Sequence, residues 1–143
     1  MADTPIIDMH HHLGQEPDYA DKLVASCERL GIVKVCVMAI ESASHLTTFG
    51  DNGYVEAASK KYPDVILGFG HVRLGVDGPE KVIELKDRGF TGLKFIVPTK
   101  PYNHESFLPI YEKAEELGMP GMFHLGIVAR HDAGHHVRVD NNL

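Results

Sequence analysis

Five short apolar runs recur at nearly even intervals along this chain of 143 residues, and this regularity constrains the fold more than any other feature. The runs begin near residues 5, 32, 64, 91 and 120, about 29 residues apart, and segments with the apolar spacing of helices separate them. Run 32–40 is rich in valine and lacks alternation, which is typical of a strand buried on both faces. The pattern therefore predicts βαβ units around a parallel sheet.

The strand and helix boundaries follow from breaking residues. Helices are expected over 18–30, 51–62, 79–88 and 107–117, and the residues that end or follow them are Gly31, Pro63, Gly89 and Gly118. Eight such units need about 230 residues, near the usual length of a TIM barrel. We therefore expect one domain, 1–143, of α/β class that forms about five of the eight βα units of a TIM-type barrel. The polar tail 131–143 is expected to be a loop without a covering helix.

Composition limits the classes of binding partner and the cellular compartment that fit this chain. The net charge is −6 and no basic run occurs, which argues against nucleic acid as the main partner. No stretch approaches the roughly 20 apolar residues that span a bilayer, and the N-terminus lacks the features of a secretory signal. Cys27 and Cys36 are expected to be buried apolar residues rather than a disulfide. We expect a cytoplasmic protein of an enzyme family that acts on small molecules. These 143 residues alone are expected to be inactive, and to be poorly soluble or to self-associate through the open sheet edges.

The first apolar run ends in a dense group of histidines, HHH at 10–12, followed by Leu13 and Gly14. Side chains alternate along a strand, so His10 and His12 should share a face, about 7 Å apart along the strand, while His11 points the other way. Two imidazoles on one face can converge on a divalent cation. The carboxyl ends of parallel strands are also where α/β folds build their sites. The alternative is a polar strand terminus or the remnant of a tag.

Three segments resemble the amidohydrolase superfamily. The segment 7–12, IDMHHH, resembles its first-strand Asp-x-His-x-His signature, 89–95 resembles its fourth strand, and 109–126 resembles its fourth helix and fifth strand. Within it, the segments resemble the amidohydrolase-related branch that contains aminocarboxymuconate-semialdehyde decarboxylase and resorcylate decarboxylases. It covers nearly the whole chain, in the same order and spacing.

The resemblance implies a distorted TIM barrel with a divalent metal, commonly zinc, at its C-terminal mouth. His10 and His12 would be first-strand ligands and His124 the fifth-strand ligand. Related proteins also use a sixth-strand histidine as acid or base and an eighth-strand aspartate. Both positions are expected beyond residue 143, so the catalytic residues are unknown. The tail histidines, at 131, 135 and 136, do not match either position.

Four other residues are candidates for the site. In some superfamily members a fourth-strand lysine is carboxylated and bridges two metals. In this branch Lys94 would instead provide a positive charge near substrate, or it packs its stem inside and takes its ammonium to the rim. His71 and Arg73 end the third strand, and Arg73 could hold a substrate carboxylate or be a solvated rim charge. Asp8 shares the parity of His10 and would orient a ligand from behind.

The leading hypothesis for function is a metal-dependent hydrolase in which an activated water attacks a C–N or C–O bond of a small substrate such as a carboxylic acid. The alternative on the same scaffold is a nonoxidative decarboxylase or hydratase. A third interpretation, from a different class, is an inactive truncated chain that only binds metal or a partner.

Overall fold

The structure is a computed structural model, and it describes residues 4–41, 49–129 and 136–139, with side chains up to residue 125. Five strands form one sheet in the order β1-β2-β3-β4-β5, and every neighbouring pair is parallel. The strands are β1 (Ile6–His11), β2 (Ile32–Met38), β3 (Ile66–His71), β4 (Gly92–Phe95) and β5 (Gly121–Phe123). The predicted parallel α/β fold is confirmed, with strands somewhat shorter than predicted.

Four helices alternate with these strands. They are α1 (Tyr19–Leu30), α2 (Asn52–Lys61), α3 (Pro79–Asp87) and α4 (Leu108–Glu116), with the 3₁₀ turn η1 (Glu105–Phe107) directly before α4. Gly31 ends α1 in the left-handed conformation, with φ of 71°, and its N–H returns to the carbonyl groups of the last turn. Such a C-terminal glycine is a strong stop signal, which explains why the helix boundaries could be predicted closely.

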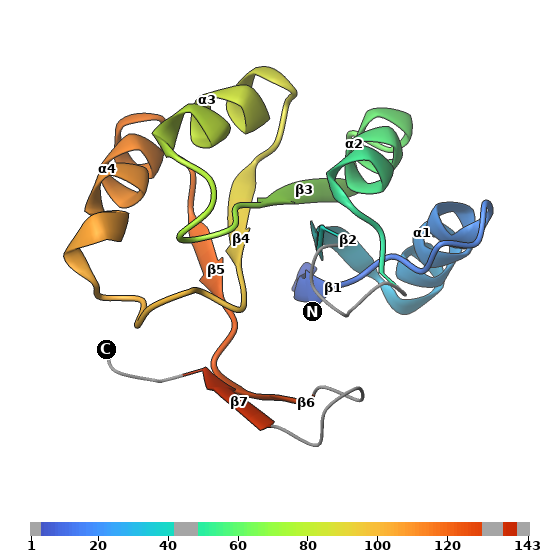
Figure 1. Ribbon diagram of the computed structural model, residues 1–143. Coiled ribbons are helices and arrows are strands. Elements are labelled where there is room, and N and C mark those ends of the chain that lie inside the picture. The colour runs from blue at the N-terminus through green and yellow to red at the C-terminus, as the bar shows by residue number, and fades with distance from the viewer. Residues whose placement is uncertain (1–3, 42–48, 130–135, 140–143) are drawn as a thin grey trace.

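The sheet curls, and the helices cover its convex side only. Figure 1 shows α1, α2, α3 and α4 arranged in sequence around the outside of the arc from β1 to β5. The order and the parallel pairing are those of five consecutive strands of a TIM barrel. The Lys94 ammonium lies 3.4 Å from Nε2 of His10, so a side chain from β4 reaches one from the end of β1 across the concave side.

Apolar side chains form two clusters, one on each face of the sheet. The large cluster joins strand residues to the helices and includes Val35, Val37, Leu85, Leu93 and Phe107, all essentially inaccessible to solvent. The small cluster consists of Cys36, Met38 and Phe69, with Leu67 and Met122 packed against it. Because Cys36 and Met38 alternate with Val35 and Val37 along β2, the small cluster lies on the concave face.

A β-bulge interrupts β1 just before the histidines. Asp8 is paired with Val35 and His11 with Val37, so three steps along β1 match two along β2. Such a bulge sets two residues opposite one partner and shifts the alternation of side chains. Asp8 therefore lies on the same side as His11, facing the helices. This corrects the parity expected for Asp8, because plain alternation would place it with His10.

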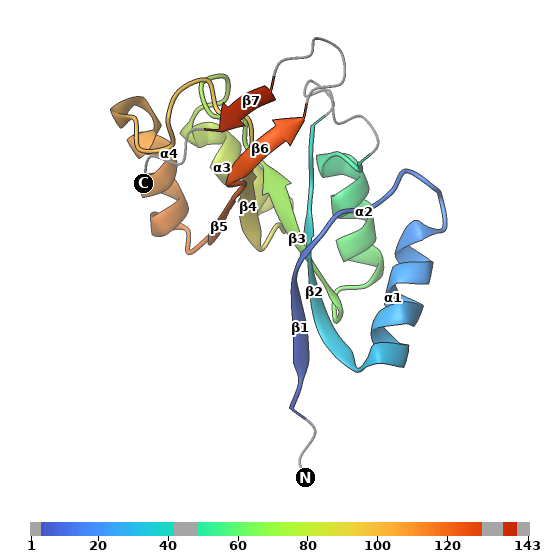
Figure 2. The ribbon, with the colours of Figure 1, turned by 90° about the horizontal axis from the view of Figure 1, so that it is seen from below.

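The structure also contains a hairpin that was not predicted. The strands β6 (Gly126–Ala129) and β7 (His136–Val139) pair in antiparallel register, where we expected a loop throughout 131–143. Both segments contain β-branched residues, which favour extended structure. Figure 1 shows the hairpin on the side of the sheet opposite the helices, and Figure 2 shows it at the end of the sheet toward which the strand arrows point. His131 and His135 lie outside the described residues.

Other expectations can be compared with the described part of the chain. Cys27 and Cys36 are both buried and free, which confirms that they do not form a disulfide. Within the residues that the structure describes, no helix is long and apolar enough to span a bilayer. Large apolar side chains of β1 are about half exposed, namely Ile6, Ile7 and Met9. Self-association through the edges of the sheet stays a prediction.

Candidate metal centre

His10 and His12 come together at the carboxyl end of β1. Their Nε2 atoms lie 3.1 Å apart, and the two rings meet edge to face. His11 points the other way, because its Nε2 lies 3.3 Å from the hydroxyl of Tyr19 on α1. The predicted division of the three histidines between two faces is therefore present.

The backbone fixes the tautomer of His12. Its Nδ1 lies 3.0 Å from the carbonyl oxygen of Met38, and because a carbonyl can only accept, Nδ1 must carry the proton. Nε2 then presents a lone pair in the neutral ring. The ring packs on Phe49, with centroids 4.7 Å apart. Burial lowers the pKa of His12 to about 4, although the Met38 carbonyl opposes this shift, so the ring is neutral at pH 7.

His124 follows β5 and approaches the pair from the far end of the sheet. It is half-buried, and its charge helps to lower the pKa of His10, after burial and the charge of Lys94. The Tyr102 hydroxyl donates to the carbonyl oxygen of His124 at 3.0 Å, which fixes the backbone there. Among the described residues, however, no three His, Cys, Asp or Glu side chains are gathered closely enough to hold a metal ion. The three-histidine site stays a prediction.

Lys94 lies at the centre of the concave side. It is fully buried, so its ammonium does not reach solvent at the rim. The pKa values of His10, His12, His71 and His124 are all lowered in part by its charge, which places one cation among four imidazoles. Burial lowers the pKa of Lys94 itself to about 8. At pH 7 most molecules therefore keep a charged ammonium beside the histidines.

His71 ends β3 directly beside Lys94. The two residues are partners in the β3–β4 register, and His71 is only 2% exposed. Its Nδ1 accepts the backbone N–H of Glu41 at 2.9 Å. Burial lowers the pKa of His71 to about 4, the largest of several effects. The ring is therefore neutral at pH 7.

Arg73 and Asp8 do not join the histidine cluster. The guanidinium of Arg73 is held by the carboxylate of Asp77, with its Nε and terminal nitrogen at 3.2 and 2.6 Å from the two oxygens. Asp8 accepts the backbone N–H of His10 at 3.0 Å, so it contacts the main chain rather than an imidazole. The roles expected for both residues stay predictions.

Sequence reasoning missed the residues that hold His71 and His124 in place. Asn52, the first residue of α2, uses both amide atoms on the backbone of His71: its oxygen accepts the N–H at 2.7 Å and its nitrogen donates to the carbonyl at 3.2 Å. Tyr102 contacts the backbone of His124 on one side only, by donating its hydroxyl to the carbonyl oxygen. An asparagine at a helix start and a loop tyrosine are common for unrelated reasons, so neither carried a usable signal.

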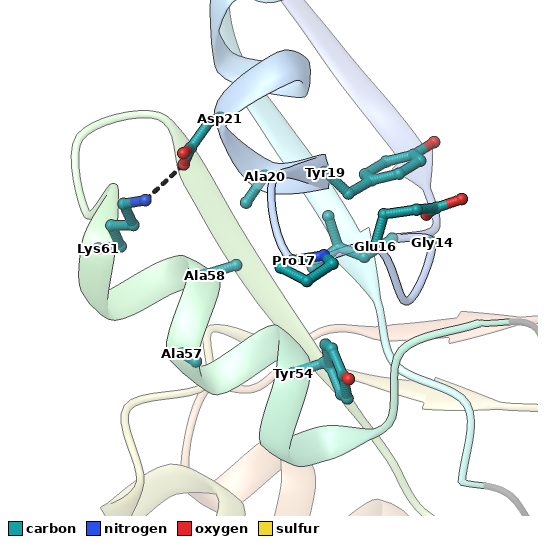
Figure 3. Close-up of a pocket in the computed structure, with 11 residues that line it drawn as sticks. Gly14, Glu16, Pro17, Tyr19, Ala20, Asp21, Tyr54, Ala57, Ala58 and Lys61 are labelled. Carbon is teal, nitrogen blue, oxygen red and sulfur yellow. Dashed lines mark hydrogen bonds and ion pairs between the residues drawn. The ribbon is translucent and has the colours of Figure 1, made fainter.

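A pocket of about 220 Å³ lies between α1 and α2, apart from this cluster. Its lining includes Pro17, Tyr19, Tyr54 and Ala58, and an ion pair between Asp21 and Lys61 crosses one end (Figure 3). None of its lining residues is one of the histidines or Lys94. The chemistry-bearing side chains therefore gather on the concave side and not in this pocket.

Comparison with known proteins gives a structural likeness. No family model matches the chain, and no curated protein matches it. An uncharacterised TIM-barrel protein from Bordetella bronchiseptica has a TM-score of 0.65 at 16% identity, covering 86% of this chain and 56% of that one. The likeness shows a TIM-barrel fold.

Two enzymes show the same likeness. 2,6-Dihydroxybenzoate decarboxylase from Rhizobium has a TM-score of 0.62 at 16% identity, covering 91% of this chain and 52% of its own. 5-Carboxyvanillate decarboxylase from Novosphingobium aromaticivorans, which holds manganese, has a TM-score of 0.59 at 16% identity, with coverage of 87% and 52%. This chain therefore spans about half the length of the solved structures that it matches.

The pair of first-strand histidines fits a divalent cation. Two nitrogens bound to one tetrahedral zinc at the usual bond length lie about 3.3 Å apart, and the Nε2 atoms of His10 and His12 lie 3.1 Å apart. His12 presents a neutral lone pair because its Nδ1 proton is engaged by Met38. A cation would bind these two nitrogens more strongly than they bind each other. Metal-binding histidines usually donate their other ring N–H to a carbonyl or carboxylate, and the Met38 carbonyl accepts this hydrogen bond from His12.

Proposed function

We propose that this chain carries the metal-binding residues of an amidohydrolase-type enzyme that acts on a small carboxylic acid. His10, His12 and His124 would hold one divalent cation, with zinc as the expected ion. The observation that carries the proposal is that the imidazoles of His10 and His12 lie on one face with their Nε2 atoms 3.1 Å apart. A backbone carbonyl sets the tautomer of His12, so that its Nε2 presents a lone pair. The resemblance of segment 7–12 to a known first-strand signature supports it independently.

A bound cation would supply a water of lowered pKa and would polarise a substrate carbonyl. The chain's own residues then have separate tasks. The Met38 carbonyl holds the His12 ring in the ligating tautomer. Tyr102 holds the backbone that presents His124. Lys94 keeps a buried positive charge beside His10, which favours an anionic substrate.

Hydrolysis of a C–N or C–O bond is the reaction expected from the sequence signature. Nonoxidative decarboxylation is a second candidate, and Lys94 favours it, because a buried cation next to the metal ligands suits a substrate carboxylate. Two solved structures with the same fold are decarboxylases of aromatic acids, which adds support for this class of substrate.

Metal content tests the proposal directly. We would purify the protein, measure bound metals by plasma mass spectrometry before and after chelation, and titrate the stripped protein with zinc. We expect about one zinc per chain, and its loss in His12→Ala. The zinc-loaded protein is then assayed with dihydroxybenzoates for released CO₂ and with simple esters and amides for hydrolysis. A chain that binds no divalent metal contradicts the proposal, and one that binds metal without turnover supports the non-catalytic interpretation.

A further inference from the structure

Two buried polar side chains sit next to each other on the concave face without enough partners. His71 on β3 and Lys94 on β4 occupy paired positions of neighbouring strands, which lie side by side in Figure 1. Leu67 and Phe69 belong to the concave cluster, and alternation along β3 places His71 on that face with them. His71 is 2% exposed and Lys94 is fully buried. Groups buried this deeply normally have hydrogen-bond partners or opposite charges.

Lys94 lacks a counter-charge in the described part of the chain. Its ammonium reaches Nε2 of His10 at 3.4 Å, and no ion pair with an Asp or Glu carboxylate is present there. A buried ammonium with one long contact to a neutral imidazole is an expensive arrangement. Metal-ligating histidines would not relieve it, because a bound cation adds positive charge. An anion is the missing partner.

His71 offers a hydrogen-bond donor to the same place. Its Nδ1 accepts a backbone N–H from Glu41, so the neutral ring must carry its proton on Nε2. That Nε2 is buried and makes no hydrogen bond of normal geometry among the described residues. The backbone of Ile96 lies near it and raises the pKa of the ring by a weak hydrogen bond, so a carboxylate would be a stronger acceptor for the same proton. Asn52 grips the backbone of His71 with both amide atoms. The donor is therefore fixed in place before any ligand arrives.

We propose that the Lys94 ammonium and the His71 Nε2–H form a subsite for a carboxylate group of the substrate, separate from the atoms that ligate the metal. The two side chains come from paired positions on adjacent strands and lie on the same face of the sheet, so one planar carboxylate placed over this pair could accept from both. A phosphate is a poorer match, because phosphate sites commonly add several backbone N–H groups or an arginine. The subsite would bind the carboxylate of the substrate in the proposed function, and it depends on that function only in lying next to the proposed metal site.

The test measures carboxylate binding and metal binding separately. Metal-free protein is titrated with benzoate, and in a second arm with inorganic phosphate, by isothermal titration calorimetry. Zinc affinity is measured on the same samples without anion. The variants are Lys94→Met and His71→Phe, and Lys86→Met is the matched control, because Lys86 is an exposed lysine on α3. Circular dichroism and thermal unfolding check that each variant is folded. Methionine is chosen at position 94 because its apolar chain has a similar length to that of lysine, so the variant is expected to fold.

We expect benzoate to bind the metal-free protein, with an affinity about tenfold or more weaker in Lys94→Met and in His71→Phe, and unchanged in Lys86→Met. Zinc affinity should change little in His71→Phe. Equal benzoate affinity in all folded proteins, or tighter binding of phosphate through the same two residues, would overturn the carboxylate subsite. Benzoate binding that depends on Lys94 and His71 in a protein that binds no zinc would leave the subsite standing and refute the metal centre instead.

Discussion

The two faces of the sheet use burial in opposite ways. The convex face packs apolar residues such as Val35, Leu93 and Phe95 against the helices, all fully buried. The concave face buries Lys94 and His71 beside only a small apolar cluster. Apolar burial stabilises a fold, whereas burial of a charge costs free energy unless a partner offsets it. The convex face therefore maintains the fold, whereas the buried charge of the concave face is what the proposed carboxylate subsite would explain.

The histidines of residues 10–12 give the largest test of this comparison. His10→Ala or His12→Ala should lower zinc affinity by about 100-fold or more, because two remaining ligands hold a cation poorly, and in the intact enzyme should remove nearly all turnover. The matched control is His11→Ala, which changes a ring that faces Tyr19 on the helix side and should have far less effect. Zinc titration and steady-state assays check both, and equal losses in all three variants would contradict the division of faces.

Stability should respond oppositely to substitutions on the two faces. Leu85→Ala removes a fully buried leucine from the convex cluster, so it should lower the free energy of unfolding by about 3 kcal/mol. Lys94→Met should leave the free energy of unfolding unchanged or raise it by about 1 kcal/mol, because the substitution removes a buried charge that has no carboxylate partner. Urea unfolding of the metal-free proteins measures both. A Lys94→Met variant as unstable as Leu85→Ala would mean that the lysine is structural.

Acid should destabilise the metal-free protein through the concave face. Burial holds the pKa of folded His71 at about 4, below the usual 6.5, so between these values the unfolded chain binds a proton that the folded one does not. This contribution to stability is present above pH 6.5 and is lost as the pH falls toward 4, at up to about 1 kcal/mol per pH unit. Unfolding free energies between pH 4 and 8 should show a shallower slope in His71→Phe, and an unchanged slope would mean that the buried ring of His71 does not cause the acid sensitivity.

Arg73 gives the smallest expected effect. Its guanidinium is engaged by both oxygens of Asp77, so Arg73→Gln should change benzoate affinity less than about twofold. Calorimetry under the conditions used for Lys94→Met measures the difference directly. A loss comparable to that of Lys94→Met would show that Arg73 leaves Asp77 to bind the carboxylate of the ligand.

The two faces also differed in how far they could be predicted. Valine-rich runs and helical spacing predicted the elements of the convex layer, because burial against helices leaves a periodic trace in the sequence. The pairing of His10 with His12 followed from alternation. The hydrogen bonds from the Asn52 side chain to the backbone of His71 join residues 19 positions apart, and no local pattern reveals such a contact. The β1 bulge and the β6–β7 hairpin were likewise missed, since each depends on pairing with another strand.

The bulge in β1 makes the strand unusually sensitive to where a residue is lost. Residues 9 and 10 together oppose one residue of β2, and the sulfur of Met9 lies 3.9 Å from that of Cys36 on the concave side. Deleting Met9 would remove the register shift between Asp8 and the histidines and leave His10 and His12 on one side. Deleting His11 would also shorten β1 by one residue, but it would make His10 and His12 consecutive and so place them on opposite faces of the sheet. Two deletions that shorten the chain equally should therefore differ in zinc binding, the first retaining it and the second abolishing it.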